Sequence, residues 1–232
     1  MQPQHSNSSL ANQELYWHGI DTEELYQKNL IKNQSQLEQY NWIGCSITYK
    51  FNNYGFRADE FGSTDPGVVF IGCSHTLGMG LPVESTWAHI VSTALTLKNY
   101  NLGVGGASND TAFRLAYYWI DQLTPDLVIF LSTERTRLEL HTGDDQRFDL
   151  SIWPHAFPMA NDFMKHWHSN DVNSDMNYLK NTLAIKQLCN ERNIKYVQEE
   201  ALTVPIVDKA RDLQHYGVIT NSRIADMFLS KL

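Results

Sequence analysis

Apolar residues occur in two kinds of segment that alternate along much of the chain. One kind is a short unbroken apolar run, and the other has apolar residues at helical spacing. The runs Val68–Ile71 and Leu127–Leu131 are short, unbroken and apolar, as is typical of strands buried on both faces of a parallel sheet. Two segments with helical spacing, Trp87–Leu95 and Phe113–Ile120, lie between these runs. A second strand is predicted at Asn99–Leu102. Strands that alternate with helices predict βαβ units with right-handed crossovers, and therefore an α/β fold.

The alternation continues towards the C-terminus after one long interruption. A helix is predicted at 178–191, a fourth strand at 194–197 and a closing helix after residue 217. Residues 133–177 are rich in aromatic residues and histidines and have no clean period. Because this segment is too long for an ordinary connection, it predicts an irregular, lid-like insertion after the third strand.

The N-terminal part does not show this alternation of strands and helices. Residues 1–64 are predicted to form a polar arm and lead-in, with a weak helical pattern at 23–37 and an edge strand at 47–51. Residues 65–232 are predicted to form the main domain. A chain of 232 residues suits one such domain with a sizeable core.

The charge of the chain limits its partners. With 18 Lys and Arg against 26 Asp and Glu, the net charge of −8 argues against a general nucleic-acid binder. Met1–Leu10 lacks the basic-then-apolar pattern of a signal peptide, and no apolar window reaches the length of a membrane span. We therefore expect no membrane contact, and a cytoplasmic location or, for a phage-encoded chain, a virion-associated one.

The cysteines favour neither a metal site nor a disulfide framework. Cys45, Cys73 and Cys189 are odd in number, lie far apart and form no Cys-x-x-Cys pair. Cys73, at the end of an apolar strand, is read as a buried inert thiol in preference to a nucleophile. No metal and no cofactor are expected.

The candidate catalytic residues lie in three segments. Ser74 follows the central strand, the segment Gly103–Asn109 follows the second strand, and Asp212 and His215 precede the closing helix. Because the carboxyl ends of parallel strands share one edge, the first two segments should lie together. An Asp-x-x-His loop can let the carboxylate fix the imidazole tautomer, leaving the other ring nitrogen free to take a proton from a serine.

Together and in this order, the three segments resemble the conserved blocks of the SGNH, or GDSL-type, hydrolases. Gly72–Thr76 resembles the nucleophile block, with Cys73 where the family usually has Asp. Asn101–Gly106 resembles the second block, in which the N–H of Gly106 would be an oxyanion donor. Asp212 and His215 match the last block, and the resemblance spans roughly residues 68–232.

The resemblance implies a fold and an activity. The fold would be a flavodoxin-like, three-layer α/β/α sandwich with about five parallel strands. The activity would be that of a serine esterase that removes an acyl or acetyl group, on a carbohydrate or another small ester. Ser74 would be the nucleophile, His215 the base and Asp212 its partner, while the N–H groups of Ser74 and Gly106 would bind the oxyanion.

The third block departs from the family pattern. Where the family has Gly-x-Asn-Asp, with an asparagine that donates to the oxyanion, this chain has Ser132-Thr133-Glu134-Arg135. Losing one such donor costs about 10²–10³ in turnover. Arg135 is the first predicted replacement, with Asn109 and Thr133 as further candidates.

This departure keeps a second hypothesis open. The chain could be a binding or structural module, for example in a phage particle, that retains the fold without efficient catalysis. The altered third block favours the module. The intact serine, glycine and Asp-x-x-His segments favour the enzyme.

Several other patterns have alternative interpretations. Gly103–Ser108 is similar to a dinucleotide loop, but it lacks the third glycine in register and follows the second strand, so nucleotide binding is not favoured. On a strand, alternation would put the imidazoles of His166 and His168 on opposite faces, which disfavours a metal site. Trp153 and Trp167 would stack on a sugar ring or simply pack.

Two arginines in the same region also have two interpretations. Arg135 and Arg137 could hold an anionic substrate, or they could balance Glu134 and Glu139.

Overall fold

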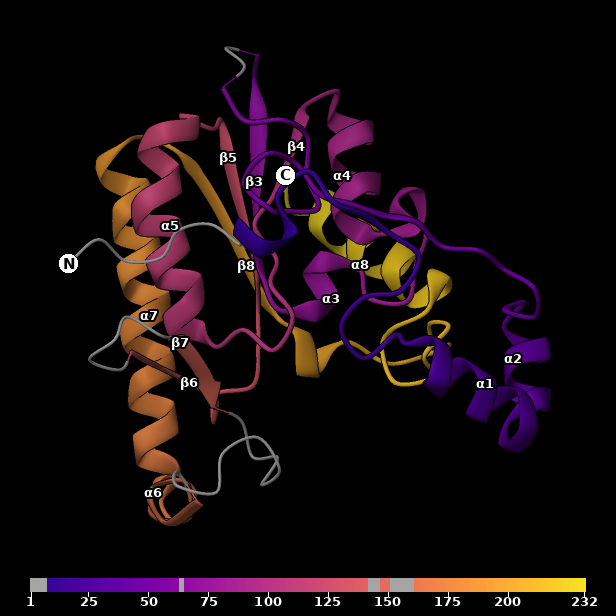
Figure 1. Ribbon diagram of the computed structural model, residues 1–232. Helices are drawn as coiled ribbons and strands as arrows, with labels where there is room; N and C mark the ends of the chain where they lie inside the picture. The colour runs from indigo at the N-terminus through magenta and orange to yellow at the C-terminus, as the bar shows by residue number, and fades with distance from the viewer. Residues whose placement is uncertain (1–7, 63–64, 142–146, 151–160) are drawn as a thin grey trace.

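The computed structural model describes residues 8–62, 65–141, 147–150 and 161–232 (Figure 1). Its centre is a parallel sheet of four strands in the order β4 (Lys98–Asn101), β3 (Gly67–Gly72), β5 (Leu127–Ser132) and β8 (Lys195–Glu200). Numbered along the chain this order is 2-1-3-4, the beginning of the flavodoxin-like order. The predicted α/β class is confirmed. The described sheet has four strands, where the resemblance implies about five.

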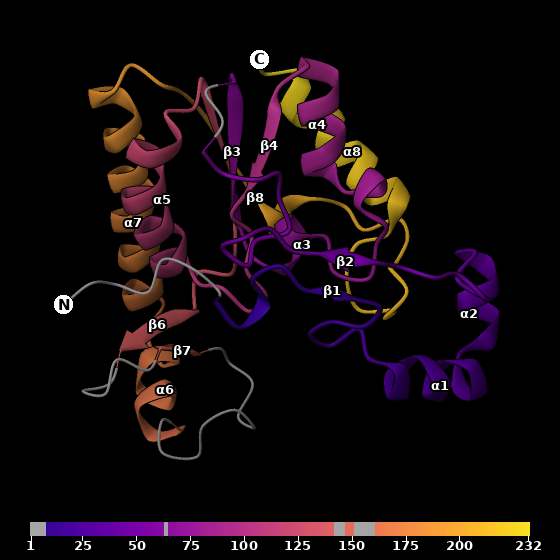
Figure 2. The ribbon, with the colours of Figure 1, turned by 45° about the horizontal axis from the view of Figure 1, so that its top comes forward.

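Helices cover both faces of the sheet (Figure 2). On one face lie α5 (Asn109–Leu123) and α7 (Asp171–Glu191), and on the other lie α4 (Trp87–Leu95) and α8 (Val218–Leu229). The three layers of the predicted sandwich are therefore present.

The central strand explains why both faces need a cover. Every residue of β3 is buried, and successive side chains of a strand point to opposite faces. Val69 and Ile71 accordingly pack in the cluster under α5 and α7. Val68 and Phe70 pack in the cluster under α4 and α8, where the Phe70 and Trp87 ring centroids lie 5.1 Å apart.

Polar caps set where the covering helices begin. The Thr86 hydroxyl accepts a hydrogen bond from the N–H of His89 and caps α4. Ser108 forms a capping box with Thr111 at the start of α5. The first turn of α5 therefore lies directly after the loop that leaves β4.

The insertion contains regular structure that the sequence did not predict. A hairpin of β6 (Leu138–His141) and β7 (Arg147–Leu150) is followed by α6 (Asn161–His168) at the carboxyl end of the sheet (Figure 1). His166 and His168 thus lie on a helix and not on a strand, which corrects the alternation assumed for them. The next helix, α7, begins at Asp171 and not at residue 178.

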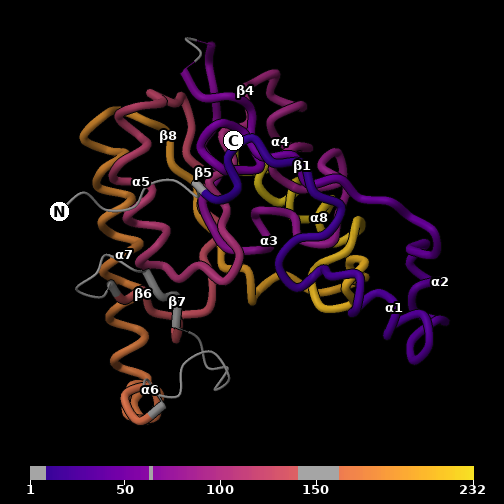
Figure 3. Tube along the Cα trace, in the orientation of Figure 1, coloured from indigo at the N-terminus to yellow at the C-terminus, as the bar shows by residue number. Residues whose placement is uncertain are grey.

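The N-terminal arm folds onto the main domain. A 3-10 turn (Ser8–Leu10) is followed by β1 (Glu14–Leu15), which pairs with β2 (Tyr49–Lys50), and the predicted helix at 23–37 is two helices, α1 (Glu23–Lys32) and α2 (Gln34–Gln39). Figure 3 traces α1 beside the yellow loop that precedes α8.

One hydrophobic cluster crosses the boundary predicted at residue 64. Trp42, Ile47 and Tyr49 of the arm pack there with Leu77 and Leu213 of the main domain. Short helical segments complete the fold: α3 (Ser74–Leu77) and the 3-10 turns Val83–Ser85 and Ala201–Thr203. No helix in the described ranges combines the length and apolar character that a bilayer crossing requires.

Candidate active site

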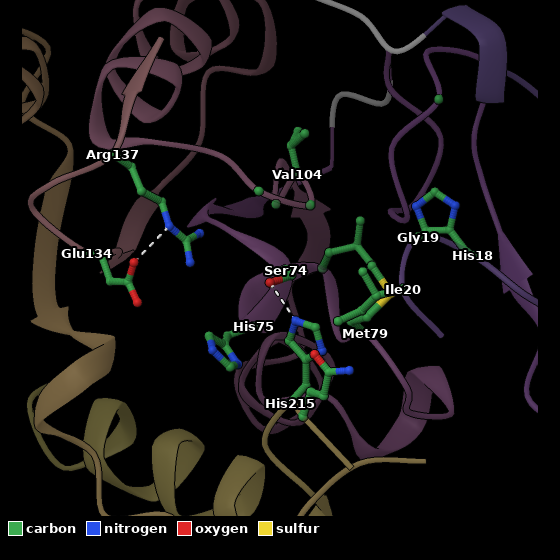
Figure 4. A pocket seen from close by; sticks show the side chains of 16 residues that line it. His18, Gly19, Ile20, Ser74, His75, Met79, Val104, Glu134, Arg137 and His215 are labelled. Carbon is green, nitrogen blue, oxygen red and sulfur yellow. Dashed lines mark hydrogen bonds and ion pairs between the residues drawn. The ribbon is translucent and has the colours of Figure 1, made fainter. Parts of the chain in front are cut away.

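Ser74 is the first residue of α3, directly after the central strand. The strand ends at Gly72, and Cys73 precedes the helix with extended backbone. This strand-to-helix transition places Ser74 at the carboxyl edge of the sheet, where open α/β folds bind ligands. Its side chain lines a cavity of about 720 Å³ (Figure 4). Cys73 is buried, as predicted for an inert thiol.

His215 lies between Ser74 and Asp212. Its Nε2 is 2.8 Å from Ser74 Oγ, and its Nδ1 is 2.5 Å from Asp212 Oδ2. The loop that carries both residues is closed by a hydrogen bond from the Ala210 N–H to the His215 carbonyl (2.9 Å). Leu213, at the turn of this loop, has a left-handed φ of 58°. The structure therefore brings together the three residues predicted as nucleophile, base and orienting carboxylate.

The second oxygen of Asp212 is also occupied. Its Oδ1 accepts hydrogen bonds from the backbone N–H groups of Gln214 (2.8 Å) and His215 (2.9 Å). Burial by itself raises the pKa of Asp212, but the hydrogen bonds from His215 and the positive charge that its ring can carry hold the pKa below its ordinary value. The carboxylate therefore stays ionised and is fixed at both oxygens.

The loop after β4 packs directly against α3. The Asn101 side chain donates to the Thr76 carbonyl (2.7 Å) and accepts from the Gly103 N–H (2.8 Å). A Cβ on Gly103 would lie 2.5 Å from the Leu77 nitrogen, so only glycine permits this approach. Gly106 has a left-handed φ of 75° and lines the cavity.

Two backbone donors face this region unpaired. The N–H of Ser74 belongs to the first turn of a helix, where N–H groups have no intrahelical partner. Within the ranges that the structure describes, neither this N–H nor that of Gly106 makes a hydrogen bond to the protein. Both remain available to an oxyanion, as the resemblance implies.

Two of the predicted replacements for the missing asparagine, Asn109 and Arg135, have other partners in the structure. Asn109 is completely buried, and both ends of its amide bind the backbone of Thr133. Arg135 pairs with Asp175 and Glu200, at 2.8 Å each, and lies over the ring of Tyr178. Neither Asn109 nor Arg135 is among the described residues that line the cavity.

Glu134 and Arg137 line the cavity instead (Figure 4). Arg137 Nε lies 3.3 Å from Glu134 Oε2. No other Lys or Arg is among the described lining residues. The sequence marked this arginine only as one of two that could hold an anion.

A second histidine lies beside the first. The ring of His75 stacks on Tyr216 at 3.8 Å between centroids and meets the ring of His215 edge-on at 5.1 Å. Burial, followed by the positive charges that His215 and Arg137 can carry, holds the pKa of His75 well below its ordinary value. His75 is therefore a neutral wall of the cavity, and no sequence signal distinguished it from other histidines.

The arm supplies the opposite wall, which the sequence did not predict. His18, Gly19 and Ile20 line the cavity. They are held by Asp21, whose carboxylate pairs with the buried Arg211 at 2.7 Å. The arm's polar composition carried no sign of this role, because Asp21 finds its partner at the far end of the chain.

The two predicted sugar-stacking residues remain predictions. Trp153 lies outside the described residues. Trp167 is on α6, where its Nε1 donates to the Thr136 carbonyl (3.1 Å), and it is not among the described residues that line the cavity. Among described side chains, no group of three or more His, Cys, Asp or Glu is arranged to hold a metal ion.

Three blocks of sequence thus converge on the carboxyl edge of a 2-1-3-4 sheet. The fold is a three-layer α/β/α sandwich, consistent with the one that the resemblance to SGNH-type hydrolases implies. No family model matches the chain, and no curated protein matches it. Solved structures that match include a putative lipolytic protein of the G-D-S-L family and several esterases, the group that the sequence motifs resemble.

Three of these solved structures illustrate the degree of similarity. An acetyl xylan esterase, AlAXEase, is 17% identical, with a TM-score of 0.34 over 72% of this chain and 99% of its own. The psychrotrophic esterase EstA from Pseudoalteromonas sp. is 14% identical, with a TM-score of 0.37 over 72% and 96%. A catalytic mutant of an acetylxylan esterase from Geobacillus stearothermophilus is 16% identical, with a TM-score of 0.37 over 73% and 94%. The sheet order and the positions of the three blocks carry the resemblance to SGNH-type hydrolases.

Proposed function

We propose that this protein is a serine ester hydrolase. The observation that carries the proposal is the continuous line of hydrogen bonds from Asp212 through His215 to Ser74, with distances of 2.5 and 2.8 Å, at the wall of an open cavity. A nucleophile within hydrogen-bond reach of a base that is itself oriented by a third group is the arrangement that serine catalysis needs.

In the first step, Ser74 Oγ attacks the ester carbonyl carbon while His215 Nε2 takes the hydroxyl proton. The imidazolium that forms is stabilised by Asp212, which accepts a hydrogen bond from Nδ1 and keeps the ring in the required tautomer. The carbonyl oxygen becomes an oxyanion, for which the N–H groups of Ser74 and Gly106 are the proposed donors.

The remaining steps use the same groups in the opposite direction. His215 returns the proton to the leaving alcohol as the C–O bond of the ester breaks, which leaves an acyl group on Ser74. A water molecule then attacks the acyl carbon and gives its proton to His215. The acid departs as Ser74 regains its proton from the imidazolium.

The cavity fits a small or medium ester. Apolar side chains of Ile20, Met79 and Val104 line it together with the glycines of the second block. Its volume, about 720 Å³, is within the usual range for small-molecule sites. We propose an acetyl or other short acyl group, carried by a carbohydrate or a comparable alcohol. Histidines supply the only aromatic rings among the described lining residues.

The decisive experiment is labelling with a fluorophosphonate probe, with mass spectrometry to locate the adduct. We expect modification of Ser74 in the parent protein and none in Ser74→Ala. Labelling elsewhere, or none at high probe concentration, would refute the proposal and favour the binding module. That alternative draws its support from the glutamate that stands at the asparagine position of the third block.

A further inference from the structure

The third block places a charged pair at the cavity. Glu134 stands where the family pattern has its donor asparagine, and Arg137 follows it on the same loop. Both residues line the cavity that contains Ser74. We infer that the guanidinium of Arg137 is the third donor to the oxyanion and replaces the missing asparagine. This inference deepens the proposed function and depends on it.

Arg137 is attached to the loop that carries the proposed glycine donor. Its Nη1 lies 3.5 Å from the carbonyl oxygen of Ala107, the residue after Gly106. Figure 4 shows the guanidinium pointing into the cavity on the side of Ser74 opposite the arm. Arg137 and Gly106 therefore line the same cavity, and Arg137 contacts the residue next to Gly106.

The pairing with Glu134 positions the arginine and leaves donors free. Glu134 contacts Nε and Ala107 contacts Nη1, whereas Nη2 has no hydrogen-bond partner among the described atoms. A guanidinium offers five N–H donors, so these two contacts leave others for the substrate. Glu134 thereby acts on the oxyanion through Arg137, as a positioning residue.

The electrostatics of the cavity favour this role. Arg137 is the only Lys or Arg among the described lining residues, and its side chain is 15% exposed. A guanidinium that is mostly withdrawn from solvent interacts more strongly with a developing negative charge than the same cation in bulk water. His75 is kept neutral by burial and does not supply a charge of its own.

The test compares Arg137→Ala with Arg135→Ala by kcat and KM on p-nitrophenyl acetate. Arg135 is the matched control because it has the same side chain on the same loop, yet pairs with Asp175 and Glu200 outside the cavity. We expect Arg137→Ala to lower kcat by about 10²–10³ with KM within a few-fold of the parent, and Arg135→Ala to retain the parent kcat. Adding guanidinium ion should restore part of the activity of Arg137→Ala, which a purely structural role would not predict.

Each outcome of this comparison either supports or overturns the proposed role of Arg137. If Arg137→Ala does not fold, by thermal unfolding, Arg137→Gln replaces it, with the same expected loss of kcat. If the parent is active and either Arg137 variant has a kcat within threefold of the parent's, the inference is overturned and the proposed function remains intact. A parent that cleaves no ester and leaves Ser74 unlabelled by the fluorophosphonate would overturn both. Loss of activity in Arg135→Ala alone would move the donor role to Arg135.

Discussion

The side-chain amide of Asn109 binds the backbone of Thr133 at both ends. Its Nδ2 donates to the Thr133 carbonyl (3.3 Å), and its Oδ1 accepts from the Thr133 N–H (3.1 Å). Asn109 has no exposed surface and Thr133 is 5% exposed. The pair joins the start of α5 to the end of β5, and so fixes the loop from which Glu134 and Arg137 reach the cavity.

Asn109→Ala should therefore destabilise the fold. The substitution leaves the buried N–H and carbonyl of Thr133 without their partner, at a cost of about 1–3 kcal/mol for a buried group left unsatisfied. Urea unfolding would measure the change, and Asn109→Asp, which keeps the acceptor, should lose less. An unchanged free energy of unfolding with a large drop in kcat would instead make Asn109 an oxyanion donor.

Substitutions in the proposed triad should remove activity without removing the fold. Asp212→Asn should lower kcat by about 10⁴, because the amide no longer stabilises the imidazolium or selects its tautomer. Ser74→Ala should leave no covalent labelling. Ser230→Ala is the control, since its hydroxyl is exposed and binds only a carbonyl in α8. Steady-state kinetics with a chromogenic acetate would measure these rates. A kcat for Asp212→Asn close to that of the parent would contradict the proposed triad.

Asp212 should also make the stability depend on pH in the acid range. Its folded pKa lies below the ordinary value of 3.8, so the unfolded chain binds a proton first as the pH falls. The stabilisation is complete above pH 3.8 and is lost as the pH drops through the folded pKa. Denaturant unfolding between about pH 2 and 6 should give a shallower acid slope for Asp212→Asn than for the parent. Equal slopes would contradict a lowered pKa for Asp212 in the folded protein.

The buried pair of Asp21 and Arg211 should be important for stability. Asp21→Ala would leave the arginine charge uncompensated in a site where the two side chains are 1% and 2% exposed. Removing one partner of a buried pair costs about 3–5 kcal/mol. Asp162→Ala is the matched control, because its pair with Lys165 is 90% and 76% exposed, and should cost about 0–1 kcal/mol. Similar losses in the two variants, by urea unfolding, would refute the distinction.

Local patterns were enough to predict the sheet and the three residues of the proposed triad. The apolar run at Val68–Ile71 is typical of a strand buried on both faces, and the rule for parallel strands then places Ser74 at the ligand edge. Asp212 and His215 share one short loop, so their mutual geometry is local. The contact of that loop with Ser74 joins residues 141 apart and was supplied by the family resemblance.

The remaining parts of the site depend on tertiary contacts that no local pattern encodes. Arg135 and Arg137 are two positions apart on one loop, and the acidic partners that α7 and β8 offer to Arg135 turn it away from the cavity. The arm resembles a polar tail because its apolar residues are spaced irregularly. Its role as a wall arises only where Trp42 and Tyr49 meet Leu213.

The bond between Asp21 and Arg211 spans 190 residues, almost the whole chain. A ribosome releases the arm early, and for most of synthesis the arm has neither its cation nor the apolar surface of the last loop. Contacts of such high sequence separation form late, since loop closure must come first. A chain that stops short of Arg211 would therefore lack the cation that Asp21 binds and would lack the imidazole of His215 as well. Burial of the arm and the contact of His215 with Ser74 therefore both depend on the loop of residues 210–215.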